Sequence, residues 1–225
     1  MTKIKERRKV ISLRKEGKTF SEIKKIVKIS KSTLSIWLKL YPLSNTQLLK
    51  VNKRKYRAIE RFIETMREKR KKRLKSYVKE ARYKLLPFSK KNLLIAGLFL
   101  YWGEGNKASP HTISINNTDP SVLKFARYWY SQALEINKKN MKIYLHLYKD
   151  MNIIKEINYW SEQLNIPKSQ FIKPYIKESK KSDLDQKGFG HGTCALVVHN
   201  TVIKEKILMN IQCIADYYSR KIVKF

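Results

Sequence analysis

The acidic side chain that stands out in this sequence is Glu104, because it ends an apolar segment, residues 92–103, that is expected to form a buried helix. Hydrolysis of a phosphodiester needs a carboxylate to hold a divalent cation, an attacking water and positive charge near the phosphate. Glu104 and Gly105 are therefore candidate ligands of Mg²⁺, and Lys107 and His191 are the candidate basic groups of a catalytic site. One carboxylate binds Mg²⁺ weakly, so we expect a homodimer to supply a second. The alternative is that Glu104 ends a helix and pairs with Lys107.

The four histidines fall into two groups, those in or near loops and those within expected strands. His191 lies in a glycine-containing loop before a strand, where an imidazole could donate to phosphate or act as a base. The alternative is a merely exposed loop histidine. His111 is a further basic candidate near the acidic motif. His146 and His199 alternate with apolar residues, which predicts surface positions on a sheet.

The charge of the chain points to a polyanionic partner. Lys and Arg number 50 and Asp and Glu 18, a formal net charge of +32 with a pI of about 10.1. Phosphate is the usual partner of such charge, and an acidic membrane surface is the alternative. With 42% hydrophobic residues, the 225-residue chain has enough apolar material for one large or two small folded domains. No apolar run is long enough to span a bilayer, and no secretory signal is evident, so we expect a cytoplasmic, nucleoid-associated protein.

The first region, residues 1–42, predicts three short helices. A basic helix runs to Gly17, Ser21 is the expected cap of the second helix, and Ser30 precedes the third. The expected core contains Leu13, Phe20, Ile23, Ile26, Leu34 and Trp37.

The third helix would turn Leu34, Trp37 and Leu38 inward and leave short polar or basic groups outside. Within residues 5–40, the pattern GKTFSEI followed by SKSTLSIWL resembles the helix-turn-helix of the resolvase and homeodomain-like superfamily. The resemblance implies that the third helix reads DNA bases, while its Lys and hydroxyl groups meet phosphates. The candidate DNA-binding residues are Lys31, Ser32, Thr33, Ser35 and Lys39. The alternative is a three-helix bundle that packs against protein.

The second region, residues 43–86, predicts one long helix or two in line, since residues 45–85 lack Gly and Pro. The basic run at residues 67–73 breaks its apolar stripe. This run is either a solvated face or a spacer that contacts phosphates through Arg70, Lys71 and Arg73.

The third region, residues 87–225, alternates helices and strands, which predicts an α+β domain with helices on a small, mostly antiparallel sheet. Strands are expected at residues 111–116, 141–148, 170–176 and 194–199. Helices are expected at residues 92–103, 119–134, 153–164 and 202–218. Trp102, Trp129 and Trp160 are expected in the core. Lys173 and Lys177, with Lys180 and Lys181, would make the second strand pair basic, as in a DNA-binding sheet; a solvated loop is the alternative.

The stretch IAGLFLYWGEG, residues 95–105, resembles the signature helix of the LAGLIDADG homing endonucleases, and the resemblance extends over about residues 88–225. It implies that two such helices pack together through small residues, and that Glu104 and Gly105 lie at a metal ion beside the scissile phosphates. Phe99 stands where the family has a helix-packing glycine, so Gly97 or Gly103 would have to supply the close contact. The helix at 153–164 is a second departure.

Together these features predict a sequence-specific double-stranded DNA-binding protein that acts as a homodimer. The leading hypothesis is a site-specific, Mg²⁺-dependent DNA endonuclease of homing or mobile-element type. Its rival is a transcription regulator that retains the fold without cleavage, and a third class is an RNA-binding basic protein. We expect neither a membrane nor a small molecule as partner.

Overall fold

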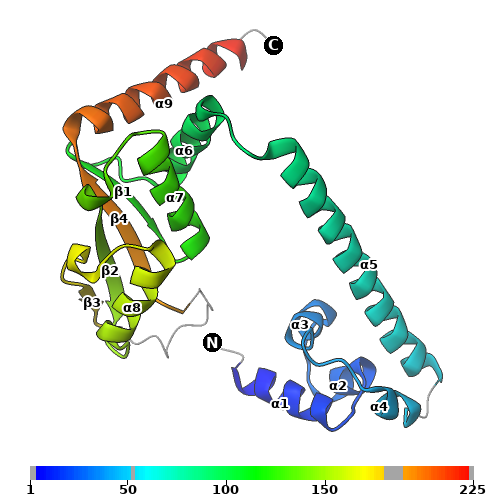
Figure 1. Cartoon of the computed structure of the whole chain (residues 1–225). Helices are drawn as coiled ribbons and strands as arrows, with labels where there is room; N and C mark the ends of the chain where they lie inside the picture. Colours follow the sequence, from blue (N-terminus) through cyan, green and yellow to red (C-terminus); the bar gives the residue numbers. More distant parts are fainter. Residues whose placement is uncertain (1–3, 52–53, 180–189, 223–225) are drawn as a thin grey trace. The chain divides into compact units, whose positions relative to one another are not determined.

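The computed structural model describes residues 4–51, 54–179 and 190–222. The chain divides into two compact units, Met1–Leu86 and Pro87–Phe225 (Figure 1). The described part of the first unit is helical, and that of the second combines helices with a four-stranded sheet, so the expected α+β class is confirmed. No helix in the described ranges is long and apolar enough to cross a membrane.

The first unit begins with three short helices, α1 (Ile4–Lys15), α2 (Phe20–Ile26) and α3 (Lys31–Trp37). Gly17 follows α1 with φ of +90°, a backbone conformation that glycine adopts without steric cost. The expected cap at Ser21 is wrong, because Thr19 caps α2: its hydroxyl accepts from the amide of Glu22, whose carboxylate accepts from the amide of Thr19. Ser30 caps α3 as expected.

The core of these three helices differs in part from the expected one. Ile23 and Leu34 are buried, but Ile26 is 46% exposed, so that prediction is wrong. Val27 and Ile29, in the connection between α2 and α3, are buried in the core instead of Ile26. The buried residues are Val10, Ile23, Val27, Ile29, Leu34 and Leu38, with Leu13, Phe20 and Trp37 partly buried against them.

Two further helices follow in this unit, α4 (Asn45–Leu49) and α5 (Arg54–Leu85). The long α5 packs against α2 near its start. From residue 68 to its end, every residue of α5 is exposed.

The second unit has the order helix, strand, helix, strand, helix, two strands, helix. Its elements are α6 (Lys90–Glu104), β1 (Thr112–Asn117), α7 (Pro120–Gln132), η1 (Lys138–Asn140), β2 (Lys142–Tyr148), α8 (Ile153–Leu164), η2 (Lys168–Gln170), β3 (Tyr175–Lys177), β4 (Thr193–His199) and α9 (Thr201–Ile222). Asp119 caps α7 and Pro120 occupies its first turn, as expected.

The sheet has the strand order β1-β4-β2-β3, in which β4 is antiparallel to both neighbours and β3 is parallel to β2. The expected strand at 170–176 is mostly wrong. Residues 168–170 form a 3₁₀ turn, and Pro174, which has no amide proton to donate, precedes the three-residue β3.

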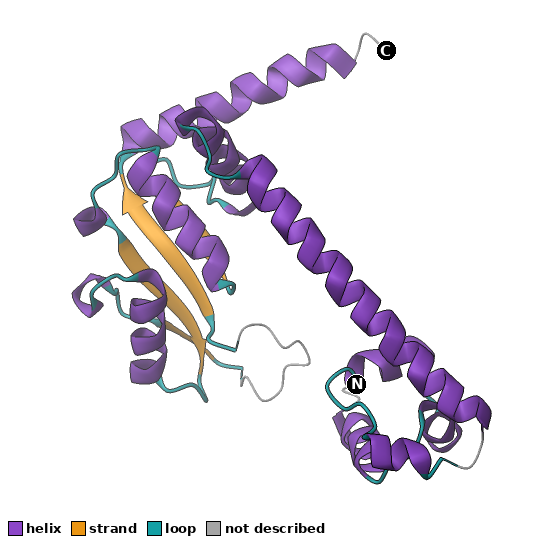
Figure 2. Cartoon of the chain, turned by 45° about the vertical axis from the view of Figure 1, so that its right-hand side comes forward, coloured by secondary structure: helices purple, strands orange, loops and turns teal. Residues whose placement is uncertain are grey.

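The two faces of the sheet differ sharply. The core face carries Ile113 and Ile115, Ile143, Leu145 and Leu147, and Cys194, Leu196 and Val198, all buried. Helices α7 and α8 lie over one face in both views (Figures 1 and 2). We call the opposite side the open face. Its residues are Thr112, Ser114, Asn116, Lys142, Tyr144, His146, Tyr148, Tyr175, Lys177, Thr193, Ala195, Val197 and His199.

The expectation that α6 is buried on all sides is wrong. One side packs into the core through Leu93, Leu98 and Tyr101, whereas Phe99 is 50% and Trp102 42% exposed. Trp129 and Trp160 are fully buried as expected, but Trp102 is not. Helix α6 therefore keeps an apolar outer side with Phe99, Trp102 and Gly103 on it.

Candidate nucleic-acid interface

The outer side of α3 gathers the residues predicted to meet DNA. Lys31, Ser32, Ser35 and Lys39 are exposed and Thr33 is half-buried. Leu34 and Leu38 anchor the inner side of the helix in the core. The hydroxyl of Ser30 lies 2.9 Å from that of Ser32 and 2.8 Å from that of Thr33, so these two are partly engaged in the cap.

A groove of about 990 Å³ lies between α3 and α5, and it brings two sets of predicted residues together. Ser35 of α3 and Lys39 of the turn after it line one side, and Arg70 and Lys71 line it from α5. Arg73 is exposed but does not line this groove. Ser35 and Lys39 therefore share one surface with part of the basic run, and the carboxylates of Glu64 and Glu68 lie on the same surface.

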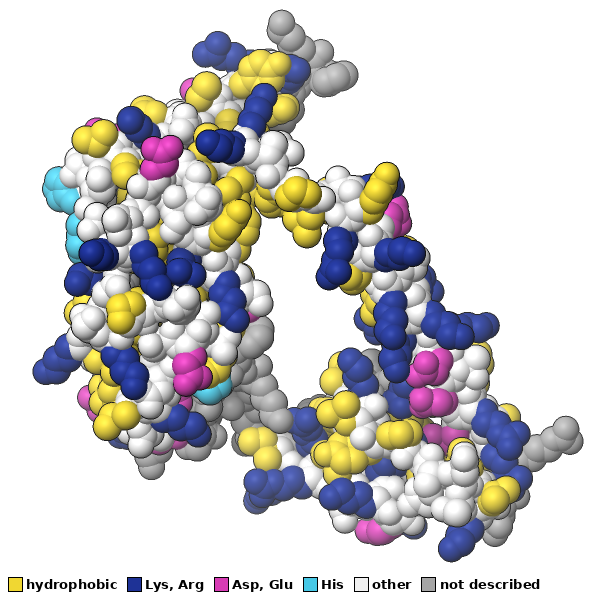
Figure 3. Space-filling model, in the orientation of Figure 1, with side chains coloured by type: hydrophobic (Ala, Val, Ile, Leu, Met, Phe, Trp, Pro, Cys, Tyr) yellow, Lys and Arg dark blue, Asp and Glu magenta, His cyan; other side chains and the backbone are white. Residues whose placement is uncertain are grey.

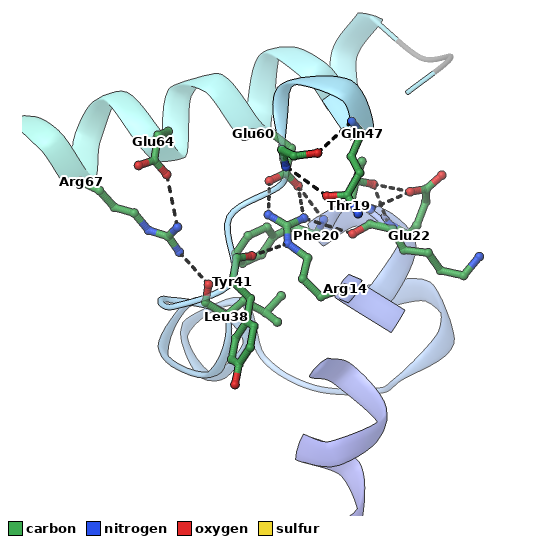
Figure 4. A network of polar contacts seen from close by, with 12 residues as sticks. Arg14, Thr19, Phe20, Glu22, Leu38, Tyr41, Gln47, Glu60, Glu64 and Arg67 are labelled. Atoms are coloured by element: carbon green, nitrogen blue, oxygen red, sulfur yellow. Dashed lines mark hydrogen bonds and ion pairs between the residues drawn. The ribbon is translucent and has the colours of Figure 1, made fainter. Parts of the chain in front are cut away.

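A buried ion pair fixes α5 against α1. The guanidinium of Arg14 donates from Nη2 to Oε2 of Glu60 at 2.7 Å and from Nη1 to Oε1 at 3.2 Å, and both side chains are almost fully buried (Figure 4). The amide of Phe20 also donates to Glu60, at 2.8 Å, and Nε of Arg14 donates to the carbonyl of Tyr41. Such a bidentate pair restricts the orientation of both helices.

A second contact joins α5 to the end of α3. Nη2 of Arg67 donates to the carbonyl of Leu38, and Nη1 pairs with Glu64 (Figure 4). Beyond this point the side chains of α5 are largely basic, and Figure 3 shows Lys and Arg side chains spread along it. Lys71 approaches Glu68 at 3.8 Å, so part of its charge is compensated within the helix.

The open face of the sheet is the second concentration of polar side chains. The ring centroids of Tyr144 and His146 are 4.9 Å apart, and those of His146 and Tyr175 are 5.6 Å apart. Nζ of Lys177 lies 5.0 Å from the ring centroid of Tyr148. Partial burial, and then the nearby charge of Lys177, lower the pKa of His146.

Of the lysines predicted near the second strand pair, Lys177 lies in β3 on the open face. Lys173 is exposed just before β3. The predictions for Lys180 and Lys181 lie outside the described residues. His146 was predicted at a surface position of the sheet, and it lies on the open face. The tyrosines of this face were not singled out from the sequence, although the alternation of Tyr144 and Tyr148 with apolar residues in MKIYLHLY was a signal for two of them.

Glu104 is exposed at the C-terminal end of α6. Glu104 is the last residue of α6, as the alternative interpretation had it, but it does not pair with Lys107: Nζ of Lys107 donates to the carbonyl of Gly105 at 3.1 Å. The carbonyl of Gly105, which was predicted to bind a metal, therefore accepts a hydrogen bond from the ammonium of Lys107. Among the residues the structure describes, no three His, Cys, Asp or Glu side chains are grouped as for a metal ion.

A buried lysine lies beneath this turn. Lys204, at the start of α9, is fully buried, and its Nζ donates to the hydroxyl of Tyr101 at 2.5 Å and to the carbonyl of Asn106. The hydroxyl of Tyr101 donates to the same carbonyl. Burial lowers the pKa of Lys204, and burial raises the pKa of Tyr101 to about 12. These contacts hold the turn after Glu104.

His191 contacts α8 and none of the residues around Glu104. Its Nδ1 lies 2.7 Å from Oε2 of the buried Glu156, and its ring stacks on Tyr159 with centroids 3.5 Å apart. The indole of Trp160 donates to the carbonyl of His191. The structure therefore gives His191 a role in holding its loop to α8, rather than a place beside Glu104. His111 likewise has its own partner, the hydroxyl of Thr201.

Comparisons with protein-family models, with curated proteins and with solved structures found no match to this chain. The functional conclusion therefore depends on the side chains of α3, α5, α6 and the sheet and on their contacts.

Proposed function

We propose that this protein is a sequence-specific double-stranded DNA-binding protein whose α3 reads the site. The observation that carries the proposal is the exposed side of α3 and of the turn after it: Lys31 and Ser35 are exposed on the helix and Lys39 in the turn, while the inner side of the helix is buried. Residues 27–30 join α2 to α3, a connection of the length found in helix-turn-helix motifs. Basic and hydroxyl side chains on such a helix are the groups that meet bases and phosphates.

The neighbouring groove extends this surface. Arg70 and Lys71 face it from α5, and the pair between Arg14 and Glu60 holds α5 to the three short helices. A helix held in this way can present its positive charges to the phosphates beside the bases that α3 contacts. The formal charge of +32 supports a polyanionic partner for the whole chain.

A selection from randomised duplex DNA tests this proposal. We expect the purified protein to enrich one sequence motif, and the substitutions Ser35→Ala and Lys39→Gln to change or abolish the enriched motif. Lys5→Gln, an exposed lysine near the start of α1, is the matched control and should lower affinity only slightly without changing the motif. Enrichment of no motif would refute sequence-specific binding.

The second candidate function is Mg²⁺-dependent cleavage by a homodimer, and the exposed side of α6 favours it. Phe99, Trp102 and Gly103 form an apolar surface on the helix that ends at Glu104. If two copies pack through this surface, their two Glu104 carboxylates come together, and with DNA phosphates they supply the oxygen ligands that Mg²⁺ takes. The rival is a transcription regulator that binds the same motif without cutting it.

The dimer and the cleavage are tested separately. Phe99→Glu should convert dimers to monomers in analytical ultracentrifugation, whereas Tyr128→Glu, an exposed aromatic on α7, should not. Metal-dependent cuts in the enriched DNA should disappear with EDTA and with Glu104→Gln, but persist with Glu162→Gln, an exposed carboxylate near the end of α8. Motif binding without any cut would establish the regulator.

A further inference from the structure

We propose that the open face of the sheet binds unpaired nucleotides of a single-stranded nucleic acid, whose bases stack on Tyr144, His146 and Tyr175. The inference extends the proposed nucleic-acid function to a second binding surface in the second unit. It depends neither on α3 nor on Glu104, so it can be tested independently of the proposed duplex binding and cleavage.

The strand register brings the three rings together. Tyr144 and His146 are two residues apart on β2 and therefore point to the same side of the sheet. Tyr175 is the partner of His146 across the parallel pair of β2 and β3. The ring centroids are 4.9 and 5.6 Å apart and the ring planes meet at 76° and 60°, so the three rings form a row of edge-to-face contacts. Tyr175 is 53% exposed, so the end of the row is accessible.

The surroundings of the row are suited to a phosphate backbone. Lys142 and Lys177 lie on the same face, and Lys173 is exposed just before β3. The described residues of the open face include no Asp or Glu. A strand of nucleotides lying on it would meet positive charge and no carboxylate from the face itself.

The ring row favours unpaired bases over duplex DNA. Stacking uses the flat faces of bases, and in a duplex these faces are covered by neighbouring base pairs. Duplex reading instead needs side chains that reach donors and acceptors on base edges, such as Arg, Asn or Gln. The residues next to the rings on β4 are Ala195 and Thr193, which are too short for this. Asn116 of β1 lies on the far side of Ala195, and its Oδ1 accepts a hydrogen bond from the hydroxyl of Ser114. A sheet with aromatic side chains on its free face is a known way to hold single-stranded bases.

The state of His146 agrees with a stacking role. Burial and the charge of Lys177 lower its pKa, which favours the uncharged imidazole ring. It then offers a π surface between the two tyrosines rather than a phosphate-binding cation.

Fluorescence anisotropy of the full-length protein tests the inference with labelled single-stranded DNA, single-stranded RNA of the same sequence, and the corresponding DNA duplex. The salt concentration is set high enough to weaken purely electrostatic binding, because the whole chain is strongly basic. Tyr144→Leu and Tyr175→Leu should each weaken single-strand binding about tenfold, with little effect on the duplex. Tyr217→Leu and Tyr218→Leu remove exposed tyrosines of α9 and serve as matched controls.

The affinities of the ring variants for single strands and for the duplex decide whether the open face binds unpaired bases. A selective loss of DNA or of RNA binding in the ring variants supports the inference and identifies which nucleic acid is bound. Unchanged single-strand affinity in Tyr175→Leu, whose exposed side chain can be replaced without disturbing the core, overturns it. An equal loss of duplex affinity also overturns it, since the face would then be a duplex surface. Failure of α3 to select a motif would refute the proposed function but leave this result unaffected.

Discussion

Gly97 of α6 lies directly against the indole of Trp129 in α7: a Cβ atom added to Gly97 would fall 2.1 Å from the ring. The close helix contact of Gly97 is therefore made inside its own unit. Gly103, by contrast, has no atom within 4 Å of an added Cβ. Of the two glycines predicted to bring a second copy close, only Gly103 is free to do so.

This contact predicts opposite effects for two alanine substitutions. Gly97→Ala should destabilise the second unit by about 1–3 kcal/mol, because Trp129 is fully buried and has no room to move. Gly103→Ala should be neutral or stabilise α6 by up to about 1 kcal/mol. Urea unfolding followed by tryptophan fluorescence measures both. Equal midpoints for the two variants would contradict the close packing of Gly97 on Trp129.

The pair between Arg14 and Glu60 predicts strong coupling in the first unit. Glu60→Leu leaves a buried guanidinium without its carboxylate and should cost about 3–5 kcal/mol. The double variant Arg14→Met with Glu60→Leu removes both charges and should recover much of that stability. Thermal unfolding monitored by circular dichroism gives the comparison. A double variant less stable than the single one would show that the pair is not the source of the effect.

Partial burial of His146 predicts a pH dependence of stability. Its pKa is lowered in the folded protein, so below about pH 6.5 the unfolded chain binds a proton that the folded chain resists. Stability from this group is therefore lost as the pH falls below that value, and it is unaffected above pH 7. His146→Gln should flatten the fall in unfolding midpoint as the pH is lowered below about 6.5. His111→Gln, at an exposed histidine just before β1, is the control.

The exposed arginines of α5 predict part of the salt dependence of duplex binding. In the double variant Arg70→Gln with Arg73→Gln, the slope of log affinity against log salt should become shallower by about 1 for each phosphate that is no longer neutralised. The affinity for duplex DNA should fall by a similar factor for every sequence. Lys84→Gln is the matched control, because Lys84 is paired with Glu80 at 2.7 Å. An unchanged slope would indicate that this stretch of α5 is a solvated face.

The contact between His191 and Glu156 predicts a structural effect. His191→Ala leaves the buried carboxylate of Glu156 without its partner and should destabilise the second unit by about 1–3 kcal/mol. Adding Glu156→Gln removes the stranded charge and should restore part of this stability. Unfolding midpoints test this. Loss of DNA cleavage in His191→Ala at unchanged stability would instead return His191 to the catalytic site.

The local sequence was enough to predict most helices and the longer strands. The helix at 153–164 has the predicted limits because Asn152 caps its start and Asn165 ends it in the left-handed conformation. The caps at Ser30 and Asp119 and the turn at Gly17 are likewise short-range features. Residues 170–176 misled because they contain several aromatic and β-branched residues typical of strands, whereas Pro174 and the turn before it leave only a three-residue edge strand.

What only the tertiary structure decided is which distant side chains meet. Composition and local pattern identified a basic chain with a candidate reading helix in α3 and an acid at Glu104, because charge and helix periodicity are properties of the sequence itself. The meeting of Arg14 with Glu60, of His191 with Glu156 and of His146 with Tyr175 depends on helix packing and strand register. Residues so far apart in the chain produce no local sequence pattern that would reveal their contact. The fold was therefore needed to show that His191 contacts Glu156 of α8 and that the rings of the open face lie side by side.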